Sequence, residues 1–154
     1  MSYDSDNIFA KMLRDEIPAV KVYEDEATLA FMDVMPQAPG HTLVIPKYAA
    51  EDLFDLDMIA GAAVLTTTQK VAAAVKDAMQ ADGIMLNQFN GTAAGQTVFH
   101  FHIHIVPRFD GVPLRKHSAN MEDMEVLEEH AAKIRAALKE YGAGHSMHYK
   151  NLAS

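Results

Sequence analysis

The sequence predicts an α+β fold, with an antiparallel sheet of about five strands and two long helices. Short apolar or alternating segments bounded by turn residues predict the strands, at 20–24, 28–33, 41–46, 84–89 and 98–106. Residues 55–80 and 122–141 are much longer stretches of helical character. Turns or a long helix join most of the strands, and these connections favour antiparallel pairing.

Proline and glycine mark the ends of several predicted elements. A short helix is expected over 4–14, where Ile8 and Met12 give an apolar face at helical spacing. Ile17 is expected to end it, because the residue before a proline disfavours helical geometry. Pro46 is expected to stop the third strand, and Gly142 the second long helix. Residues 109–120 have no clear period and are expected to form a mobile loop.

The composition is that of one globular domain without disulfides. The 154 residues suffice for a single domain, assigned to 1–141, followed by a mobile C-terminal tail at 142–154. The sequence has no cysteine, which excludes a thiolate nucleophile, a cysteine zinc knuckle and a disulfide framework. A chain without cysteine fits a reducing compartment, so a cytoplasmic location is expected.

The charge of the chain limits its partners. A net charge of -8 argues against binding to bulk nucleic acid, which requires clustered lysine and arginine, but leaves room for a small nucleotide in one pocket. The polar, acidic N-terminus is unlike a signal peptide. No apolar run approaches the roughly 20 residues of a membrane span, so no membrane association is expected.

Three histidines alternate with apolar residues near the end of the last predicted strand. Successive strand side chains point to opposite faces, so His100, His102 and His104 are expected on one face. The opposite, core-facing side is expected to carry Phe99, Phe101, Ile103 and Ile105. A slip of one residue would exchange the two sets, so the register of this strand is strongly specified.

Three interpretations of these histidines remain open from the residues alone. They could be ordinary surface or core residues, or two of them could bind a metal ion. The metal interpretation is weakened because no Asp or Glu lies between Gly91 and Val106 to complete or orient a site. The third interpretation is nucleophilic catalysis at phosphorus by a neutral imidazole. The small-residue loop at 90–97 could then direct backbone N–H groups at an anion.

The motif resembles a known family. His100 to Val106 match His-φ-His-φ-His-φ-φ, where φ is apolar, which is the motif of the histidine triad (HIT) superfamily. The segments that resemble its Hint branch, the purine nucleoside phosphoramidases, are 8–18, 29–33 and 36–47. The similarity extends from about Ile8 to Arg108. The HIT-like fold that it implies agrees with the predicted α+β class.

The resemblance implies a role for each histidine. His102 matches the nucleophile that takes up the nucleotidyl group, with its other nitrogen held by a backbone carbonyl. His104 matches the histidine that contacts the phosphate and assists the leaving group. His100 matches a supporting histidine, and His41 an imidazole beside it.

The resemblance also implies a nucleotide site. Asp33 matches the acid that binds the ribose hydroxyls. The polar groups around the phosphate and leaving group are Gln96, Thr97 and Asn90. The apolar slot for the base is formed by Ile8, Phe9, Phe31 and Val34. Without the resemblance, Asp33 and Asn90 would be interpreted as turn residues and the apolar four as core.

The chain departs from the Hint pattern in two places. Pro107 and Arg108 follow the triad, as in bacterial and Fhit-like members, and lead into about 45 further residues. Ala10 stands in a stretch where some bacterial members have a cysteine pair, so no structural zinc is expected. The resemblance implies catalysis without metal or other cofactor, a small nucleotide ligand such as AMP, GMP or a derivative, and a homodimer.

Four hypotheses for the function follow. The first is a hydrolase of a nucleoside 5′-phosphoramidate or similar purine nucleotide, acting at the α-phosphate through a covalent His102 adduct. The second is a dinucleoside polyphosphate hydrolase or nucleotide transferase that uses the same histidines. The third is a nucleotide-binding signalling or scaffold protein with incidental catalysis. The fourth is a metalloprotein.

Overall fold

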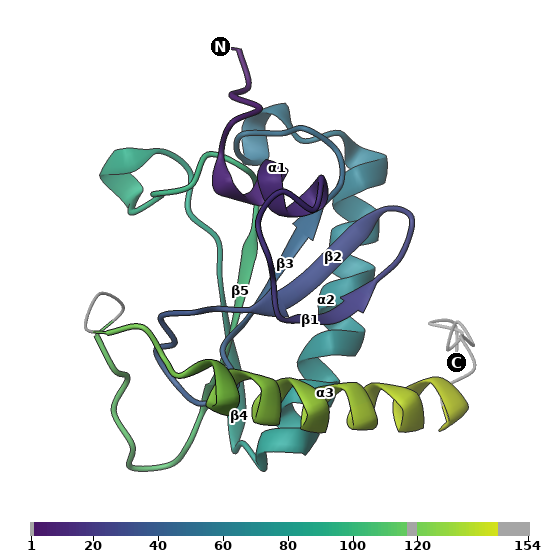
Figure 1. Cartoon of the computed structure of the whole chain (residues 1–154), viewed down its shortest axis with the longest axis vertical. Coiled ribbons are helices and arrows are strands. Elements are labelled where there is room, and N and C mark those ends of the chain that lie inside the picture. Colours follow the sequence, from purple (N-terminus) through teal and green to yellow (C-terminus); the bar gives the residue numbers. More distant parts are fainter. Residues whose placement is uncertain (1, 117–119, 145–154) are drawn as a thin grey trace, which may run out of the picture.

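The computed structural model describes residues 2–116 and 120–144 of the chain (Figure 1). In chain order the principal elements are α1 (Ile8–Leu13), β1 (Lys21–Glu24), β2 (Thr28–Met32), β3 (Thr42–Pro46), α2 (Met58–Met79), β4 (Gly83–Asn87), β5 (Ile103–Arg108) and α3 (Met124–Gly144). The strands form one sheet in the order β1-β2-β3-β5-β4, and all neighbours are antiparallel. The predicted α+β class, with two long helices, is therefore confirmed.

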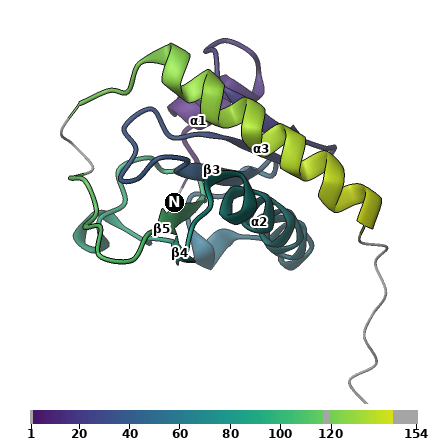
Figure 2. The ribbon, with the colours of Figure 1, turned by 90° about the horizontal axis from the view of Figure 1, so that it is seen from below.

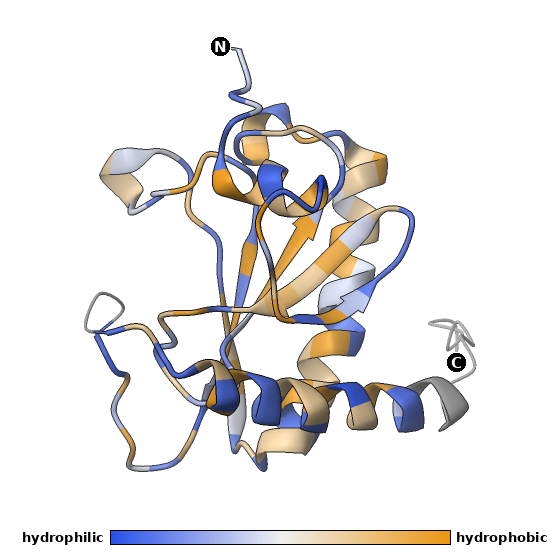
Figure 3. Cartoon of the chain, in the orientation of Figure 1, coloured by the Kyte–Doolittle hydropathy of each residue, from blue (hydrophilic) through white to orange (hydrophobic). Residues whose placement is uncertain are grey.

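Each face of the sheet packs into its own apolar cluster. One cluster joins the strands to the two long helices, through residues such as Val44, Ile105, Val71 and Leu127. The other cluster contains Leu29, Phe31, Leu43, Ile45 and, from α1, Phe9. Figure 1 shows α1 in front of the strands and α2 behind them. Because both faces are covered, β2 and β3 are buried along their whole length and appear largely hydrophobic in Figure 3.

Helix α2 is the long element behind the sheet. The Asp57 carboxylate accepts the N–H groups of Ile59 and Ala60 and so caps its first turn. By length and composition α2 could also cross a membrane, because an 18-residue window has a mean hydropathy of 1.3. The packing of α2 gives another explanation of its apolar composition, because one side of the helix lies against the sheet and α3 crosses the helix (Figure 2).

Several predicted boundaries are wrong, each for a local reason. The first helix begins at Ile8 instead of residue 4, because the Asn7 side chain accepts the Ala10 N–H and caps it there. The second long helix does not stop at Gly142 and continues to Gly144. Residues 145–154 of the predicted tail, and 117–119 of the predicted mobile loop, lie outside the described residues.

The predicted last strand is the element that differs most. It was expected over 98–106, whereas β5 begins at Ile103. In the segment before it, the Phe101 N–H donates to the Ala50 carbonyl oxygen instead of to a neighbouring strand. Phe99 was expected in the core, but it is half-buried and lines a surface cavity, because the alternation that a strand imposes does not extend to it. Phe101, Ile103 and Ile105 do pack into the core.

We expect Gly40 to be essential for the turn that leads into β3. Its φ angle is +93°, and an added Cβ would lie 2.6 Å from Met79 Cγ. Gly40→Ala is expected to lower the free energy of unfolding by about 2–5 kcal/mol, from backbone strain and overpacking together. Gly111→Ala is the matched control, because Gly111 has a φ of +75° but open space around it. Its loss should be about 1–2 kcal/mol, the strain alone. Equal losses in urea denaturation would contradict the Met79 contact.

Candidate active site

The three triad histidines lie at the start of β5 and in the segment before it, and all three are buried. Their exposed fractions are 0% for His100, 6% for His102 and 7% for His104. The His102 and His104 rings lie side by side, with centroids 5.0 Å apart, and Phe9 lies edge-on to His102 at 5.0 Å. Because β5 lies between β3 and β4, His104 sits opposite both Leu43 and Asn87. The cluster is thus held between α1 and the middle of the sheet.

The hydrogen bond from His102 to the backbone determines which of its nitrogens carries the proton. Its Nδ1 lies 2.7 Å from the carbonyl oxygen of His100. A carbonyl oxygen only accepts, so Nδ1 carries the proton of the neutral ring. The Nε2 nitrogen of His102 therefore has a lone pair, as a nucleophile at phosphorus requires.

His104 is in the opposite tautomer, because a chain of hydrogen bonds begins at a backbone amide. The Gln37 N–H donates to Nδ1 of His41 at 3.0 Å, so the His41 proton is on Nε2. That Nε2–H donates to Nδ1 of His104 at 2.9 Å, so His41 lies beside His104 and not beside His100, as the resemblance had implied. The neutral His104 ring must then carry its proton on Nε2. Two neighbouring imidazoles thus offer different groups: a lone pair on His102 and an N–H donor on His104.

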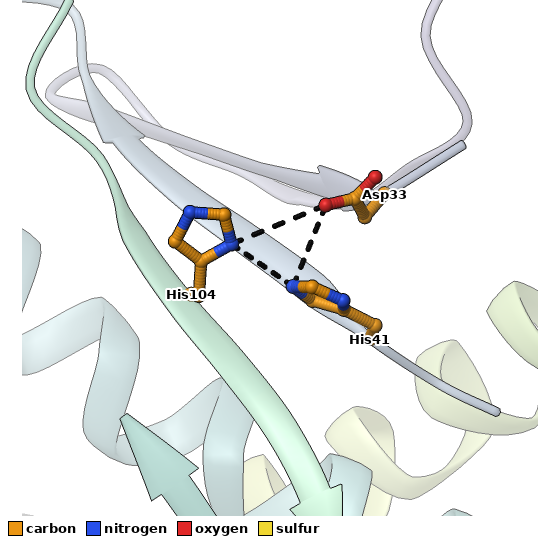
Figure 4. A group of neighbouring side chains, drawn as sticks. All are labelled: Asp33, His41 and His104. Carbon is orange, nitrogen blue, oxygen red and sulfur yellow. Dashed lines mark hydrogen bonds and ion pairs between the residues drawn. The ribbon is translucent and has the colours of Figure 1, made fainter. Parts of the chain in front are cut away.

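Asp33 completes this group, as Figure 4 shows. Its Oδ2 lies 3.4 Å from His41 Nε2 and 4.0 Å from His104 Nδ1, while its Oδ1 accepts the Met35 N–H at 2.8 Å. No carboxylate lies near the triad in the sequence, but the fold brings one beside His104 from Asp33, which follows β2 and is far away in the chain. Possible ligand atoms of Asp33, His41 and His104 lie within 4.8 Å of one another. A metal ion bound there would have to break the His41–His104 hydrogen bond.

His100 is fixed through both ring nitrogens. Its Nε2 donates to the Pro46 carbonyl oxygen at 2.8 Å, and its Nδ1 lies 2.5 Å from the Tyr3 hydroxyl. Burial lowers the pKa of His100 below its ordinary value. Tyr3 was not among the residues predicted from the sequence, because an isolated tyrosine before the first helix has no motif around it. The contact is visible only in the fold.

The loop at 90–97 is tied down by its own side chains. The Gln96 amide donates to the carbonyl oxygens of Glu51 and Val98 and accepts the Gly91 N–H. Gln96 therefore holds the loop in this structure, and its predicted catalytic contact stays a prediction. Asn90 is similarly engaged, because its Oδ1 accepts the Leu53 N–H at 2.8 Å.

A cavity of about 550 Å³ lies beside this loop. It is lined by Ser2, Asp4, Asp6, Asn7, Ile8, Glu51, Thr97, Val98 and Phe99. Two residues predicted to contact nucleotide, Ile8 and Thr97, are thus together at its wall. Three carboxylates give the cavity an acidic character.

The four residues of the predicted base slot have different surroundings. Ile8 is 47% exposed, whereas Phe9 and Phe31 are buried and pack edge to face at 5.3 Å. Phe31 therefore packs against the Phe9 ring and helps to hold it in place. Val34 is half-buried and packs against the cluster on the other face of the sheet. The structure thus unites Ile8, Phe9 and Phe31 around α1, and leaves Val34 apart from them.

Comparison with known proteins identifies the class. The sequence model of the HIT domain matches residues 14–111, more than half of the chain. Protein hit of Bacillus subtilis is 41% identical over 102 residues, which are 66% of this chain and 70% of that protein. Adenylylsulfatase HINT3 of Arabidopsis thaliana is 36% identical over 124 residues, 77% of this chain and 63% of the relative.

Solved structures agree with the sequence comparison. A Hit-like protein involved in cell-cycle regulation from Bartonella henselae is 54% identical, with a TM-score of 0.83 over 88% of this chain and 99% of that chain. A hypothetical histidine triad nucleotide-binding protein from Sulfolobus tokodaii is 32% identical, with a TM-score of 0.80 over 87% and 93%. The chain belongs to the HIT family. Members of this family are nucleotide-binding hydrolases and transferases.

The burial of neutral His100 predicts a pH dependence of stability. Its pKa is lowered in the folded protein, so between the ordinary value near ~6.5 and the folded value only the unfolded chain takes up the proton. The free energy of unfolding should therefore fall as pH drops below ~6.5, by at most about 1.4 kcal/mol per pH unit from this residue. His100→Gln should make that slope shallower in urea denaturation between pH 8 and 5.

The control for this measurement is His130→Gln. Burial also lowers the pKa of His130, on α3, so its replacement should remove a separate contribution and leave that of His100 in place. A His100→Gln protein with the same slope as the wild type would contradict the assignment of a neutral buried His100.

Proposed function

We propose that this protein hydrolyses a purine nucleoside 5′-phosphoramidate or a related nucleotide at the α-phosphorus, through a covalent nucleotidyl-His102 intermediate. The observation that carries the proposal is the pair of opposite tautomers on neighbouring rings, with centroids 5.0 Å apart. The lone pair on His102 is suited to attack phosphorus, and the N–H on His104 to bind a phosphoryl or leaving-group atom.

In the first step, His102 Nε2 forms a bond to the α-phosphorus while the bond from phosphorus to the leaving group breaks. The electron pair of that bond goes to the leaving nitrogen, which takes up a proton from solvent. His104 Nε2–H donates a hydrogen bond to the phosphoryl oxygens as charge develops on them. The positive charge on the nucleotidylated His102 ring is stabilised by the His100 carbonyl oxygen, which continues to accept the Nδ1–H.

In the second step, water attacks the phosphorus of the adduct. The bond from His102 Nε2 to phosphorus breaks, the nucleoside monophosphate leaves, and the proton lost by the attacking water returns to solvent. His102 regains its lone pair in the same tautomer, because the His100 carbonyl has held Nδ1–H throughout. The overall reaction consumes one water and gives an amine and a nucleoside monophosphate.

The relatives support this class of substrate. The name of the Arabidopsis relative, an adenylylsulfatase, indicates a substrate with an adenylyl group for that protein. An adenylyl sulfate and an adenosine phosphoramidate share the α-phosphorus and differ in the leaving group, so the same two histidines can serve both. The cavity that contains Thr97, a residue expected near the leaving group, has an acidic wall formed by Asp4, Asp6 and Glu51, and such a wall would favour an amine over an anionic leaving group.

Replacing the nucleophile tests the mechanism directly. His102→Ala is expected to lower turnover of an adenosine phosphoramidate by about 10⁴-fold or more, because the covalent step is lost. His104→Ala removes assistance without removing the bond-forming atom, so roughly 100 to 10,000-fold is expected. The measurement is steady-state turnover together with mass spectrometry of protein quenched during the reaction, which should place a nucleotidyl group on His102.

His130→Ala is the matched control, since this histidine lies on α3 and should keep wild-type activity. The assay is repeated after exhaustive chelation to test the metal hypothesis. Near-full turnover by His102→Ala, or activity that disappears with chelator and returns with zinc, would contradict the proposal. In the second case the group formed by Asp33, His41 and His104 would be the site to test for zinc.

We also propose that two copies associate through β4 and the exposed side of α2. In the part of the chain that the structure describes, β4 is an edge strand that pairs with β5 alone, so its outer edge offers backbone groups for pairing. On β4 itself Leu86 is 49% exposed, and near the start of α2 the exposed fractions are 85% for Phe54, 83% for Met58 and 82% for Ile59. The bond from Leu53 to Asn90 connects this apolar surface to the residues that follow β4. A second copy would cover the edge and the surface together.

Sedimentation at micromolar concentration is expected to give twice the chain mass of 16.9 kDa. Ile59→Glu should shift the protein towards the monomer, because it places a charge on the proposed apolar interface. Val112→Glu is the control, since Val112 is also exposed, at 53%, but lies in the loop after β5. A wild-type mass of 16.9 kDa, or equal effects of the two variants, would contradict this interface.

A further inference from the structure

Tyr3 reaches the active site from outside the matched HIT domain. It precedes α1, and residues 14–111 are those that match the family. Its hydroxyl lies 2.5 Å from Nδ1 of His100, and the two rings meet edge to face with centroids 5.6 Å apart. The first histidine of the triad therefore has a partner from outside the residues that match the family model.

The direction of this hydrogen bond follows from the other side of the His100 ring. Its Nε2 lies 2.8 Å from the Pro46 carbonyl oxygen, which can only accept, so the ring proton is on Nε2. Nδ1 of the neutral ring is then an acceptor, and the Tyr3 hydroxyl must be the donor. Burial raises the pKa of Tyr3, which keeps the hydroxyl protonated for this purpose.

The position of His100 matters because the chain around it lacks the support of the sheet. β5 begins only at Ile103, so no strand ladder holds the residues just before it. The backbone is fixed there by the Phe101 N–H bond to Ala50 and by the two bonds of the His100 ring. The carbonyl oxygen of this same His100 accepts the Nδ1–H of His102.

We propose that Tyr3 is a positioning residue for the nucleophile: it holds His100 in one tautomer and orientation, and so fixes the carbonyl that keeps the lone pair of His102 on Nε2. This inference rests on the proposed function, since it concerns the same histidine. It assigns part of the active site to the segment before α1.

The segment before α1 has other anchors besides the Tyr3 hydroxyl. The Arg14 guanidinium donates to the Ser5 carbonyl oxygen at 2.8 Å, and the Asn7 side chain caps α1. Tyr3→Phe is therefore expected to keep the fold and the ring packing, while the buried Nδ1 of His100 loses its donor. The His100 ring and its backbone carbonyl then lose one of the contacts that hold them.

The test compares Tyr3→Phe with the wild type in two measurements. Single-turnover formation of the nucleotidyl adduct is expected to slow by about 10 to 100-fold with KM unchanged within about twofold, because misplacement of a reacting group affects the chemical step. Nitrogen-15 NMR of the imidazoles should show one His102 tautomer, protonated on Nδ1, in the wild type. It should show a mixture of tautomers in Tyr3→Phe.

Tyr23→Phe is the matched control. Its hydroxyl also makes a hydrogen bond, to Asp25 Oδ2 at 2.8 Å, but it belongs to β1 and does not touch the triad. This variant should keep the wild-type rate and the single His102 tautomer.

The outcomes separate this inference from the proposed function. A Tyr3→Phe protein with the wild-type adduct rate and a single His102 tautomer would overturn the role of Tyr3. A loss of rate that Tyr23→Phe shares would also overturn it, because the effect would then be one of general stability. A wild-type protein that forms no adduct would contradict the proposed function, while the NMR comparison would still decide whether Tyr3 sets the tautomer.

Discussion

The hydrogen bond from His102 Nδ1–H to the His100 carbonyl oxygen is the interaction on which the rest of the site depends. A neutral imidazole has one proton and two nitrogens. His102 can act as a nucleophile only if the proton is on Nδ1, so that Nε2 keeps its lone pair. A backbone carbonyl is a reliable means of ensuring this, because it accepts at every pH at which the protein is folded. Backbone groups also set the tautomers of two other histidines. The Pro46 carbonyl oxygen accepts from His100, and the Gln37 N–H donates to His41.

The strand pairing of the sheet brings the residues of the site together. β2 ends at Met32 and β3 begins at Thr42, so Asp33 and His41 flank the connection between two paired strands, and the Asp33 N–H donates to the His41 carbonyl oxygen. β5 then pairs with β3 and brings His104 beside them. Antiparallel pairing therefore joins residues that are about 60 positions apart in the sequence, and the loop between β2 and β3 is as much a part of the site as the triad.

Much of this could be predicted from the sequence because the signals were local. The five strands and two long helices follow from periodicity, and the alternation of Phe101, Ile103 and Ile105 with the histidines holds in the structure. The early end of that alternation could not be predicted, because a strand requires a partner and the pattern does not show where the partner ends. Contacts between distant segments were also missed: the carboxylate of Asp33 beside His104, and the hydroxyl of Tyr3 on His100.

The irregular path of the chain before β5 has a consequence for its dynamics. A ladder strand in the centre of a sheet opens only when the sheet unfolds, and its amide hydrogens exchange with solvent at the slowest, global rate. His102 lies just outside the ladder, so its segment can open by breaking the Phe101–Ala50 bond and the contacts of the His100 ring while β3, β4 and β5 stay paired. His102 therefore lies next to the hydrogen-bonded sheet but is not held by its strand ladder. Local opening of this segment is therefore expected on a timescale separate from that of unfolding.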